Sequence, residues 1–314
     1  MKYLIYKLEP KSPFHIGIKE GSLEETLHYI PSDTLFSAFC NVYRLIYGKE
    51  KFEQLLRKFT EKNPPFLFSS IFPCINGKPL FPLPKSVGRE RLKMDEENKK
   101  IKKIEYVDED IFKALLNGKT IEIEKKNIIQ DKILSKEIKE LVWKEIERPR
   151  VTIDRKTNSS EIYYFGEVVF MDKLYFLVDL KDEKYKKEIE TTLRVLGDEG
   201  IGGDRTYGRG LFSMMRVNEI EFYENDSPWH VILSMLYPTE KDLKGLKGYF
   251  ELVARGGWVY SVDEKGKRRK FIRMFVEGSV FNKKVVGKMV EVAKGKHAVY
   301  RYGYAFSLPI RVRE

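Results

Sequence analysis

A glycine-rich run between residues 197 and 210 constrains the fold more than any other feature of this chain. It reads Gly-Asp-Glu-Gly-Ile-Gly-Gly-Asp-Arg-Thr-Tyr-Gly-Arg-Gly, and it follows a helical pattern and precedes a strand-like one. A dinucleotide-binding fingerprint follows the first strand of a βαβ unit and opens a helix, and a Walker A loop ends in Gly-Lys-Ser or Gly-Lys-Thr. The run fits neither motif, so it is a connection from a helix to a strand.

The composition of this run is that of an anion-binding loop. Gly202 and Gly203 let backbone N–H groups approach an anion without a Cβ in the way. Arg205 and Arg209 add forked donors that match phosphate oxygens. The alternative is a flexible surface turn, because clustered glycines often form only turns.

The rest of the composition is that of a folded protein with no membrane span. With 314 residues, the chain is long enough for two domains of ordinary size. No apolar stretch approaches the roughly 20 residues that cross a bilayer, so we expect a soluble, cytoplasmic protein. Cys40 and Cys74 form no CxxC motif and only four histidines occur, so we expect no metal, disulfide framework or other cofactor.

Positive charge is concentrated in the last fifth of the chain. The net charge is +11, and residues 255–314 hold 15 Lys and Arg against 5 Asp and Glu. Residues 85–150 hold 18 basic and 15 acidic side chains, which is typical of a solvated face. The local excess favours an anionic partner, although a thermophile-like composition is a competing explanation for individual charges.

Hydrophobic periodicity predicts an α+β protein. Residues 2–8 alternate as a strand, and Ser32 is the expected N-cap of an amphipathic helix that ends at Gly48. An insertion at about residues 85–148 is rich in Lys and Glu and lacks a clear core stripe. The other expected elements are a proline-interrupted edge strand or loop at 66–72 and 78–83, strands at 162–170 and 174–180 around a turn at 171–173, a helix at 184–196 and a strand at 211–217.

The order of these elements predicts two ferredoxin-like, or RRM-like, domains. Residues 1–217 follow the plan β-α-β-(insertion)-β-α-β, with the glycine-rich run between the second helix and the last strand. Residues 218–314 are expected to form a second, degenerate version with poorly marked helices. Its expected elements are strands at 230–236, 249–254, 271–276, 288–292 and 305–312 and a short helix at 240–246.

An ordered set of motifs resembles the RAMP superfamily of CRISPR proteins. In the first domain the motifs are Phe14-His15-Ile16-Gly17, residues 30–38 (IPSDTLFSA), residues 148–155 (RPRVTIDR) and the run at 200–210. In the second domain, three further motifs are similar to the C-terminal domain of subunit four of the type III-A CRISPR Csm complex. They are residues 255–259 (RGGWV), 277–281 (EGSVF) and 299–306 (VYRYGYAF).

This resemblance implies a non-catalytic subunit that holds the repeat-derived five-prime tag of the crRNA. Such a subunit contacts the backbone RAMP subunit on one side and the large polymerase-nuclease subunit on the other, with no membrane involved. The insertion corresponds by this resemblance to a thumb, an element with a β-hairpin that wedges beside the guide and is ordered by RNA and neighbouring subunits. A stabilising or disordered surface insertion is the alternative.

A single-stranded RNA tag offers phosphates, 2′-hydroxyls and unstacked bases, so its receptor needs glycines, guanidinium groups and aromatic planes. Tyr207 is expected either to stack on a base or to pack on its own domain. Arg150 and Arg155 lie at the foot of the expected thumb, and Asp154 is able to neutralise one of them. The candidate RNA-binding residues are His15, Arg150, Arg155, Gly202, Gly203, Arg205, Tyr207, Gly208, Arg209 and Arg255.

Two other functions stay open. His15 near the first helix is the residue type that acts on a ribose 2′-hydroxyl in a metal-independent CRISPR-repeat endoribonuclease, although a structural hydrogen bond explains it equally well. Asp33 is expected to act on the helix dipole, and Glu20, Glu24 and Glu25 supply no cleavage pattern, so we expect no nuclease activity. The equivalent subunit of a type III-B complex is the remaining alternative.

The C-terminal charge excess has its largest contributor in the basic run of residues 265–270. This run is expected to be either a solvated turn or a contact with RNA or a partner. Trp258 is expected to lie in the core or at an interface.

Overall fold

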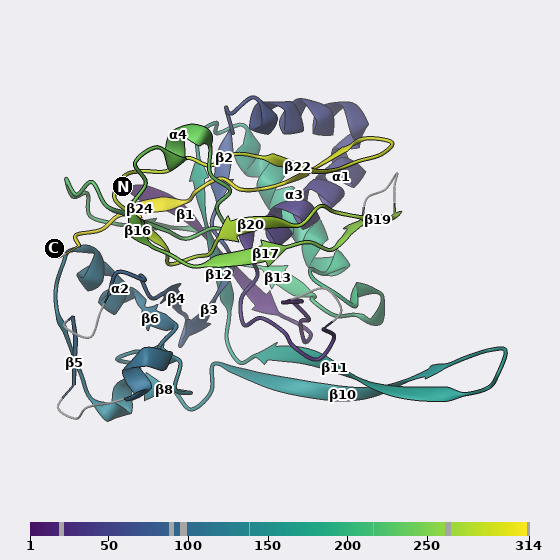
Figure 1. Ribbon diagram of the computed structural model, residues 1–314, viewed down its shortest axis with the longest axis horizontal. Helices are drawn as coiled ribbons and strands as arrows, with labels where there is room; N and C mark the ends of the chain where they lie inside the picture. Colours follow the sequence, from purple (N-terminus) through teal and green to yellow (C-terminus); the bar gives the residue numbers. More distant parts are fainter. Residues whose placement is uncertain are drawn as a thin grey trace.

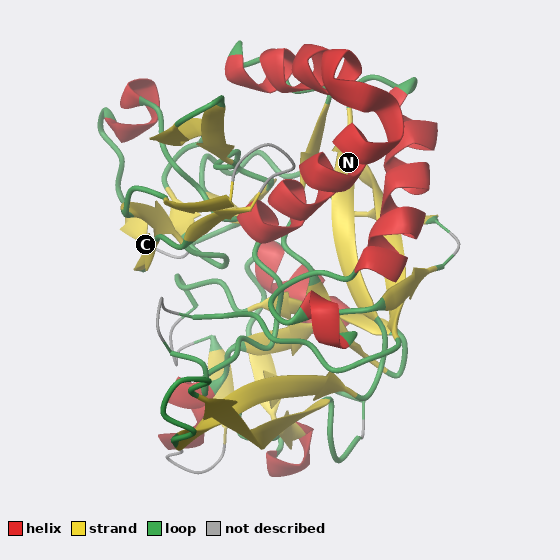
Figure 2. Ribbon diagram, turned by 90° about the vertical axis from the view of Figure 1, so that its right-hand side faces the viewer, coloured by secondary structure: helices red, strands yellow, loops and turns green. Residues whose placement is uncertain are grey.

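A computed structural model describes residues 1–18, 22–87, 91–94, 99–137, 139–215, 217–260 and 265–312 of the chain (Figures 1 and 2). It has many short strands and few helices, which confirms the α+β class. None of the helices in these residues is both long enough and apolar enough to span a membrane.

One sheet of ten strands forms the body of the protein. Its strand order is β13-β1-β12-β3-β4-β6-β9-β8, with β14 also paired to β1 and β2 also paired to β12. β1 lies antiparallel to both β12 and β13, so the expected first and last strands of the first domain are neighbours. The strands are β1 (Lys2–Pro10), β2 (Phe66–Phe68), β3 (Phe72–Ile75), β4 (Lys78–Pro82), β6 (Tyr106–Asp108), β8 (Ile128–Ile129), β9 (Ile133–Leu134), β12 (Leu174–Leu180), β13 (Phe212–Met214) and β14 (Asn218–Glu221).

Two long helices, α1 (Ser32–Thr60) and α3 (Tyr185–Glu199), pack on each other and on the core of the main sheet. The apolar stripes that predict them are buried, as the spacing of Leu35, Phe36 and Phe39 in α1 requires. α1 continues twelve residues beyond its expected end at Gly48, where a φ of +81° produces a kink. The glycine therefore bends the helix instead of ending it.

Ser32 is not the helix N-cap that its sequence position predicts. The helix begins at Ser32 itself, and Pro31 holds the N-cap position without a side-chain hydrogen bond. The Ser32 hydroxyl instead accepts a hydrogen bond from the backbone N–H of Met235 at 3.0 Å, and the Ser32 N–H donates to Ser70 Oγ at 2.8 Å. Ser32 thus joins the two halves of the chain, because the fold brings Met235 to it.

The prediction of an edge strand or loop is wrong for residues 78–83, which form β4, whereas in 66–72 the strand β2 pairs only with β12 among the described strands and residues 69–70 form a loop. β3 and β4 lie inside the main sheet, because β12 pairs with β3 on one side and β6 pairs with β4 on the other. β6 belongs to the insertion. β6, which is distant in sequence, thus pairs with β4, the strand that its prolines predict to lie at an edge.

The insertion at 85–148, in which the sequence shows no clear core stripe, adds buried side chains to the main hydrophobic core. The helix α2 (Glu109–Leu116) buries Ile111, Phe112, Leu115 and Leu116, and Phe112 stacks on Phe81 of β4 with ring centroids 4.3 Å apart. Its elements are two to eight residues long, which is too short for a hydrophobic period to be visible. The remaining ones are β5 (Leu92–Met94), β7 (Ile121–Ile123) and the 3₁₀ turns η1 (Lys99–Lys103) and η2 (Lys125–Asn127).

A long hairpin, β10 (Trp143–Ile153) and β11 (Ser160–Phe170), projects from the body of the protein (Figure 1). The two strands pair without a break from Trp143–Phe170 to Ile153–Ser160. The expected strands at 162–170 and 174–180 are both present, yet β11 pairs with β10, whereas β12 pairs with β1. The projecting element therefore spans residues 143–170 and lies mostly after the expected insertion.

The C-terminal half consists of small sheets. A four-stranded sheet has the order β16-β21-β15-β24, and β17–β20, β18–β19 and β22–β23 form pairs. In the described part of residues 218–314, α4 (Glu240–Leu243) is the one helix. The strands are β15 (His230–Ile232), β16 (Gly248–Tyr249), β17 (Leu252–Arg255), β18 (Trp258–Tyr260), β19 (Lys265–Arg268), β20 (Ile272–Phe275), β21 (Val280–Phe281), β22 (Val290–Lys294), β23 (Ala298–Arg301) and β24 (Ser307–Pro309).

The two halves share one hydrophobic core. Tyr302 stacks on Phe36 of α1 with ring centroids 4.7 Å apart, and the Tyr304 hydroxyl donates a hydrogen bond to the carbonyl of Phe59 at 2.6 Å. Both tyrosines are buried. The position of the C-terminal half against α1 is therefore fixed by packing, and the division at residue 217 stays a prediction.

Candidate nucleic-acid interface

A groove of about 980 Å³ lies between the two halves, where the glycine-rich run, the start of α1 and residues 253–258 meet. Of the ten candidate residues, five line it: His15, Gly202, Gly203, Arg205 and Arg255. The fold thus brings together residues that are up to 240 positions apart in sequence.

His15 is buried and holds the glycine-rich run against the base of the hairpin. Its ring Nδ1 is 2.7 Å from the carbonyl oxygen of Gly166, and its ring centroid is 4.3 Å from that of Phe165. Its backbone carbonyl accepts a hydrogen bond from the Gly203 N–H at 2.8 Å. A Cβ at Gly202 would lie 2.5 Å from the same carbonyl oxygen, so close packing on His15 requires glycine there.

The other glycines of the run shape the loop itself. Gly210 has a φ of +75°, and a Cβ there would lie 2.0 Å from the Ile201 carbonyl oxygen, so the loop closes only with glycine at this position. Gly208 has a φ of +72° and ends the 3₁₀ turn η3 (Arg205–Tyr207). Both are needed for the conformation that presents Arg205 and Tyr207.

The side chains of η3 are well placed for a ligand. The Arg205 guanidinium lies over the Tyr260 ring, 4.6 Å from its centroid, at the wall of the groove. Tyr207 is 70% exposed, so it does not pack into the core of its own domain. The Arg150 guanidinium lies 5.1 Å from the Tyr207 centroid. Because the Tyr207 ring is exposed beside the Arg150 guanidinium, stacking on a base stays the prediction for this side chain.

Arg150 and Arg209 converge on Glu167, a residue that the sequence analysis did not single out. The Glu167 carboxylate is fully buried and accepts hydrogen bonds from Arg148 Nε at 2.7 Å and Arg209 Nε at 2.6 Å. Arg150 lies 3.8 Å from the same carboxylate and also pairs with Asp204. We call Glu167, Arg148, Arg150 and Arg209 the hairpin cluster, since it joins β10, β11 and the glycine-rich run.

Asp154 and Arg155 lie away from this cluster, in the turn of the hairpin. Asp154 accepts hydrogen bonds from the backbone N–H groups of Lys156 and Thr157, at 2.7 and 3.2 Å, so it shapes the turn and does not pair with Arg150. Arg155 is exposed and does not line the groove. Its place at the tip separates it from the other candidates.

Asp33 is the centre of a second cluster of arginines. Arg255 donates to both of its oxygens, from Nε at 3.1 Å and Nη2 at 3.0 Å, and Arg301 Nη1 donates to Oδ2. Burial alone raises the pKa of Asp33, but the two guanidinium groups outweigh burial and lower this pKa from 3.8 to about 2. We call Asp33, Arg255 and Arg301 the seam cluster. Asp33 is therefore a buried anion with a structural role, and the Arg255 guanidinium is largely occupied by its hydrogen bonds to Asp33.

Positive charge dominates the groove. Four arginines line it, Arg205, Arg255, Arg269 and Arg301, and Asp33 is the one acid among the described residues of its wall. Burial, together with repulsion from Arg301 and Arg255, lowers the pKa of Arg269 to about 10, against the opposing attraction of Asp33. The Nε atoms of Arg269 and Arg301 are buried without a hydrogen-bond partner. This arrangement favours binding of an anion.

Arg269 and Arg301 were not among the candidate residues, although each belongs to a segment that the sequence analysis noted. Arg301 is in the motif at 299–306, and Arg269 is in the basic run at 265–270, of which residues 265–268 form strand β19 and not a turn. Arg301 pairs with Asp33, and Arg269 feels its charge, only in the folded chain, because Asp33 is more than 230 residues away in sequence.

Three exposed aromatic side chains stand on the C-terminal side of the groove. Trp258, Tyr260 and Phe271 line it and are 54%, 52% and 62% exposed. Trp258 is thus not a core residue, and the Arg268 guanidinium lies 5.2 Å from its ring centroid. Glu24 and Glu25 are exposed outside the groove, and Glu20 lies outside the described residues.

Comparison with known proteins identifies the relatives of this chain. Residues 7–213 match the model of the RAMP superfamily, and residues 225–310 match the model of the CRISPR Csm4 C-terminal domain. The chain is 31% identical over 331 residues to the "CRISPR system Cms protein Csm4" of Thermococcus onnurineus, covering 100% of this chain and 98% of the relative. It is 27% identical over 374 residues to the protein of the same name from Methanocaldococcus jannaschii, covering 98% and 97% of the two chains.

Solved structures show the same fold. A crystal structure of a Csm1-Csm4 cassette in complex with cA4 contains a chain that matches with a TM-score of 0.67 and 25% identity, covering 100% of both chains. A crystal structure of a Csm3-Csm4 subcomplex of the type III-A CRISPR-Cas interference complex matches with a TM-score of 0.68 and 22% identity, over 99% of this chain and 100% of the other. The chain belongs to the RAMP superfamily and, within it, to the Csm4 family of CRISPR proteins.

Proposed function

We propose that this chain is a non-catalytic subunit of a type III-A CRISPR interference complex and holds the repeat-derived five-prime tag of the crRNA in the groove. The observation that carries the proposal is the charge of that groove: four arginines and one buried carboxylate line it, beside three exposed aromatic rings. Guanidinium groups bind the phosphates of a single strand and aromatic faces stack on its bases. A cationic or purely apolar ligand does not match this wall as well.

We propose that the chain bridges the backbone RAMP subunit and the large polymerase-nuclease subunit. Its structural relatives were crystallised with Csm1 and with Csm3, which supports two separate contact surfaces.

The ferredoxin-like plan is proposed for both halves. The order β13-β1-β12-β2, with α1 and α3 in the crossovers, supports it for the first half. For the second half the support is limited to its antiparallel sheet and α4.

The thumb is proposed to be the hairpin β10–β11 and not the whole insertion. The hairpin projects from the body (Figure 1), and its strand β10 carries Arg148 and Arg150, which contact Glu167 and Asp204. The face formed by Val151, Ile153, Ile162 and Tyr164 is exposed over its outer part. A long, exposed apolar hairpin is the shape that a wedge beside a guide RNA requires.

Two observations support a binding subunit over an endoribonuclease. His15 has its Nδ1 held by the Gly166 carbonyl and its ring packed on Phe165, which is a structural position. The Asp33 carboxylate is paired with two arginines and has a pKa of about 2, far from the neutral range that suits a general acid or base. Incubating the protein with repeat RNA tests this: cyclic-phosphate ends that disappear in His15→Ala would overturn the non-catalytic proposal.

Binding of a tag-bearing RNA tests the groove directly. Arg205→Ala is expected to weaken affinity roughly tenfold and to reduce the salt slope of log K by about 0.7–1, because one phosphate contact is lost. Arg209→Ala is expected to have a smaller effect, since its Nε is already bound to Glu167. Arg194→Ala on the exposed face of α3 is the matched control. Unchanged affinity and salt slope in both Arg205→Ala and Arg209→Ala would exclude the proposed site.

A further inference from the structure

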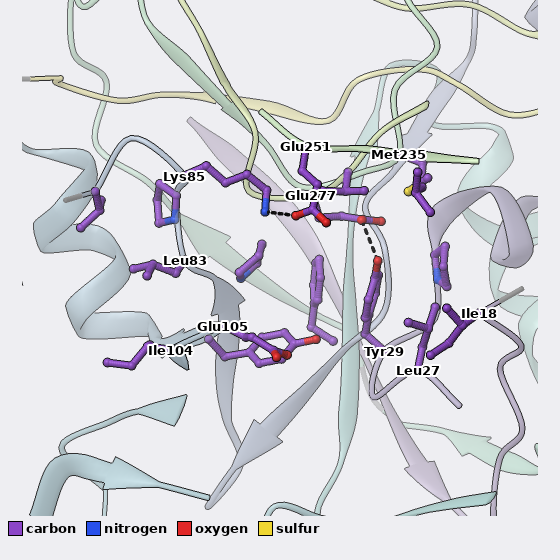
Figure 3. Close-up of a pocket in the computed structure, with 18 of the residues that line it drawn as sticks. Ile18, Leu27, Tyr29, Leu83, Lys85, Ile104, Glu105, Met235, Glu251 and Glu277 are labelled. Carbon is purple, nitrogen blue, oxygen red and sulfur yellow. Dashed lines mark hydrogen bonds and ion pairs between the residues drawn. The ribbon is translucent and has the colours of Figure 1, made fainter. Parts of the chain in front are cut away.

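A second cavity, of about 530 Å³, adjoins the groove where three parts of the chain meet (Figure 3). Tyr29 comes from the segment before α1, Leu83 directly follows β4, Tyr106 comes from β6 of the insertion, and Glu277 comes from the C-terminal half. We call this cavity the Glu277 pocket. Its volume is within the roughly 300–1,000 Å³ of small-molecule sites.

The walls of the Glu277 pocket are aromatic and aliphatic. Tyr29 and Phe72 stack with an interplanar angle of 18° and ring centroids 5.9 Å apart, and Tyr106 adds a third aromatic side chain. Leu83 and Ile104 line the cavity from the insertion side (Figure 3). Such walls favour a flat, apolar-faced ligand.

One carboxylate is buried in these apolar walls. Glu277 is 6% exposed and accepts hydrogen bonds from the Tyr29 hydroxyl at 3.0 Å and from the Ser70 hydroxyl. None of the ion pairs of the described residues includes it, and burial raises its pKa. A buried carboxylate held by two neutral hydroxyls is costly unless a ligand uses it, because buried charges are otherwise paired.

Cationic side chains line the pocket together with the acids Glu105, Glu251 and Glu277. Lys85 pairs with Glu251 at 2.7 Å, and Lys102 and Arg255 also line the cavity. Ile18, Val253 and Arg255 line both this pocket and the groove. A strand whose phosphates follow the arginines of the groove therefore passes the mouth of the pocket, and one of its bases is able to enter.

We propose that the Glu277 pocket binds a single unstacked guanine base, with Glu277 accepting the N1–H and 2-amino hydrogens and the aromatic walls covering the ring faces. An ionised carboxylate only accepts hydrogen bonds, and the Watson–Crick edge of guanine offers two adjacent donors. Uracil offers one donor between two carbonyl acceptors, and adenine and cytosine place a ring acceptor beside the amino group. The inference rests on the proposed RNA-binding function and names the base that this site selects.

The test uses the unmodified protein first. Affinities are measured for an eight-nucleotide oligouridylate and for versions with a single guanosine at each successive position. One position is expected to bind roughly tenfold more tightly with guanosine than with uridine, and inosine there, which lacks the 2-amino group, is expected to lose part of this gain. If oligouridylate binds in a salt-dependent way and no position prefers guanosine, the pocket inference is wrong and the proposed function stands.

Glu277→Gln is expected to abolish the guanosine preference and to leave affinity for oligouridylate unchanged. Glu53→Gln, at an exposed position of α1, is the matched control and is expected to keep the preference. Tyr29→Phe, which removes one hydroxyl from the carboxylate and keeps the ring, is a second variant that does not alter the charge. A guanosine preference that persists in folded Glu277→Gln would overturn the assignment.

Titration with GMP distinguishes an RNA base from a free nucleotide. GMP binding that RNA displaces and that Glu277→Gln abolishes assigns the pocket to a base of the bound strand. If GMP binding depends on Glu277 but RNA does not displace the GMP, the pocket binds the guanine base of a free nucleotide. If neither GMP nor guanosine-containing RNA binds, both the pocket inference and its RNA source are wrong.

Discussion

The hairpin cluster and the seam cluster are built alike but differ in how far their arginines are exposed to solvent. Each places several arginines around one buried carboxylate, Glu167 in the first and Asp33 in the second. In the hairpin cluster the arginine side chains are 20–46% exposed, whereas Arg255 and Arg301 of the seam cluster are 12% and 4% exposed. Exposed guanidinium groups keep water on one side and stay able to bind a second anion. The buried ones instead hold the two halves of the chain together.

The largest effect is expected from breaking the seam cluster. Asp33→Asn leaves Arg255 and Arg301 buried without their anion, and is expected to lower the free energy of unfolding by about 3–5 kcal/mol. Chemical denaturation measures this. Asp182→Asn, which removes only exposed ion pairs, is the control and is expected to change little. A loss for Asp33→Asn no larger than that of the control would show that the halves are held by packing alone.

The pH dependence of the seam cluster is the next largest effect. The folded-state pKa of Asp33 is lowered from 3.8 to about 2, so its stabilisation is fully present above pH 3.8 and is lost as the pH falls toward 2. The shift corresponds to about 2 kcal/mol. The difference in unfolding free energy between the native chain and Asp33→Asn should therefore shrink by that amount across this window, as denaturation at a series of pH values would measure. A difference that stays constant would contradict the pairing.

The smallest effect on stability is expected from the hairpin cluster. Glu167→Gln removes the charge that Arg148, Arg150 and Arg209 share, but these exposed side chains remain hydrated, so the loss is expected to be on the order of 1–2 kcal/mol. Hydrogen exchange should show reduced protection in β10 and β11 and little change in α1. A loss as large as that of Asp33→Asn would remove the distinction between the two clusters.

Much of the first half could be predicted from the sequence because its elements are long. The strand at 2–8 and the helices that begin at 32 and near 184 each repeat their apolar pattern often enough to be recognised, and all three are present. The insertion was not recognised as contributing to the core, because its strands and its eight-residue helix are too short to show a period. Its buried face is recognisable only when Phe112 is seen against Phe81.

The candidate site was predicted in part. Arg205 and Tyr207 lie where a ligand could reach them, whereas Arg209 and Arg255 point to acids that no local pattern connects to them. Arg269, Arg301 and Glu277 lie in segments that the sequence analysis noted, but none of them was a candidate residue, because the groups that surround them are distant in sequence. The Glu277 pocket depends on three segments meeting, which periodicity does not encode.

The sequence by itself determined the α+β class, the long elements of the first half and the family, because these depend on local patterning and ordered motifs. The tertiary structure alone decided that β12 pairs with β1, where Ser32 and Asp33 find their partners, and which arginines remain available in the groove. These outcomes depend on contacts between residues far apart in the chain. Hydrogen bonds and charge pairs of that kind have no sequence period, so only folding selects them.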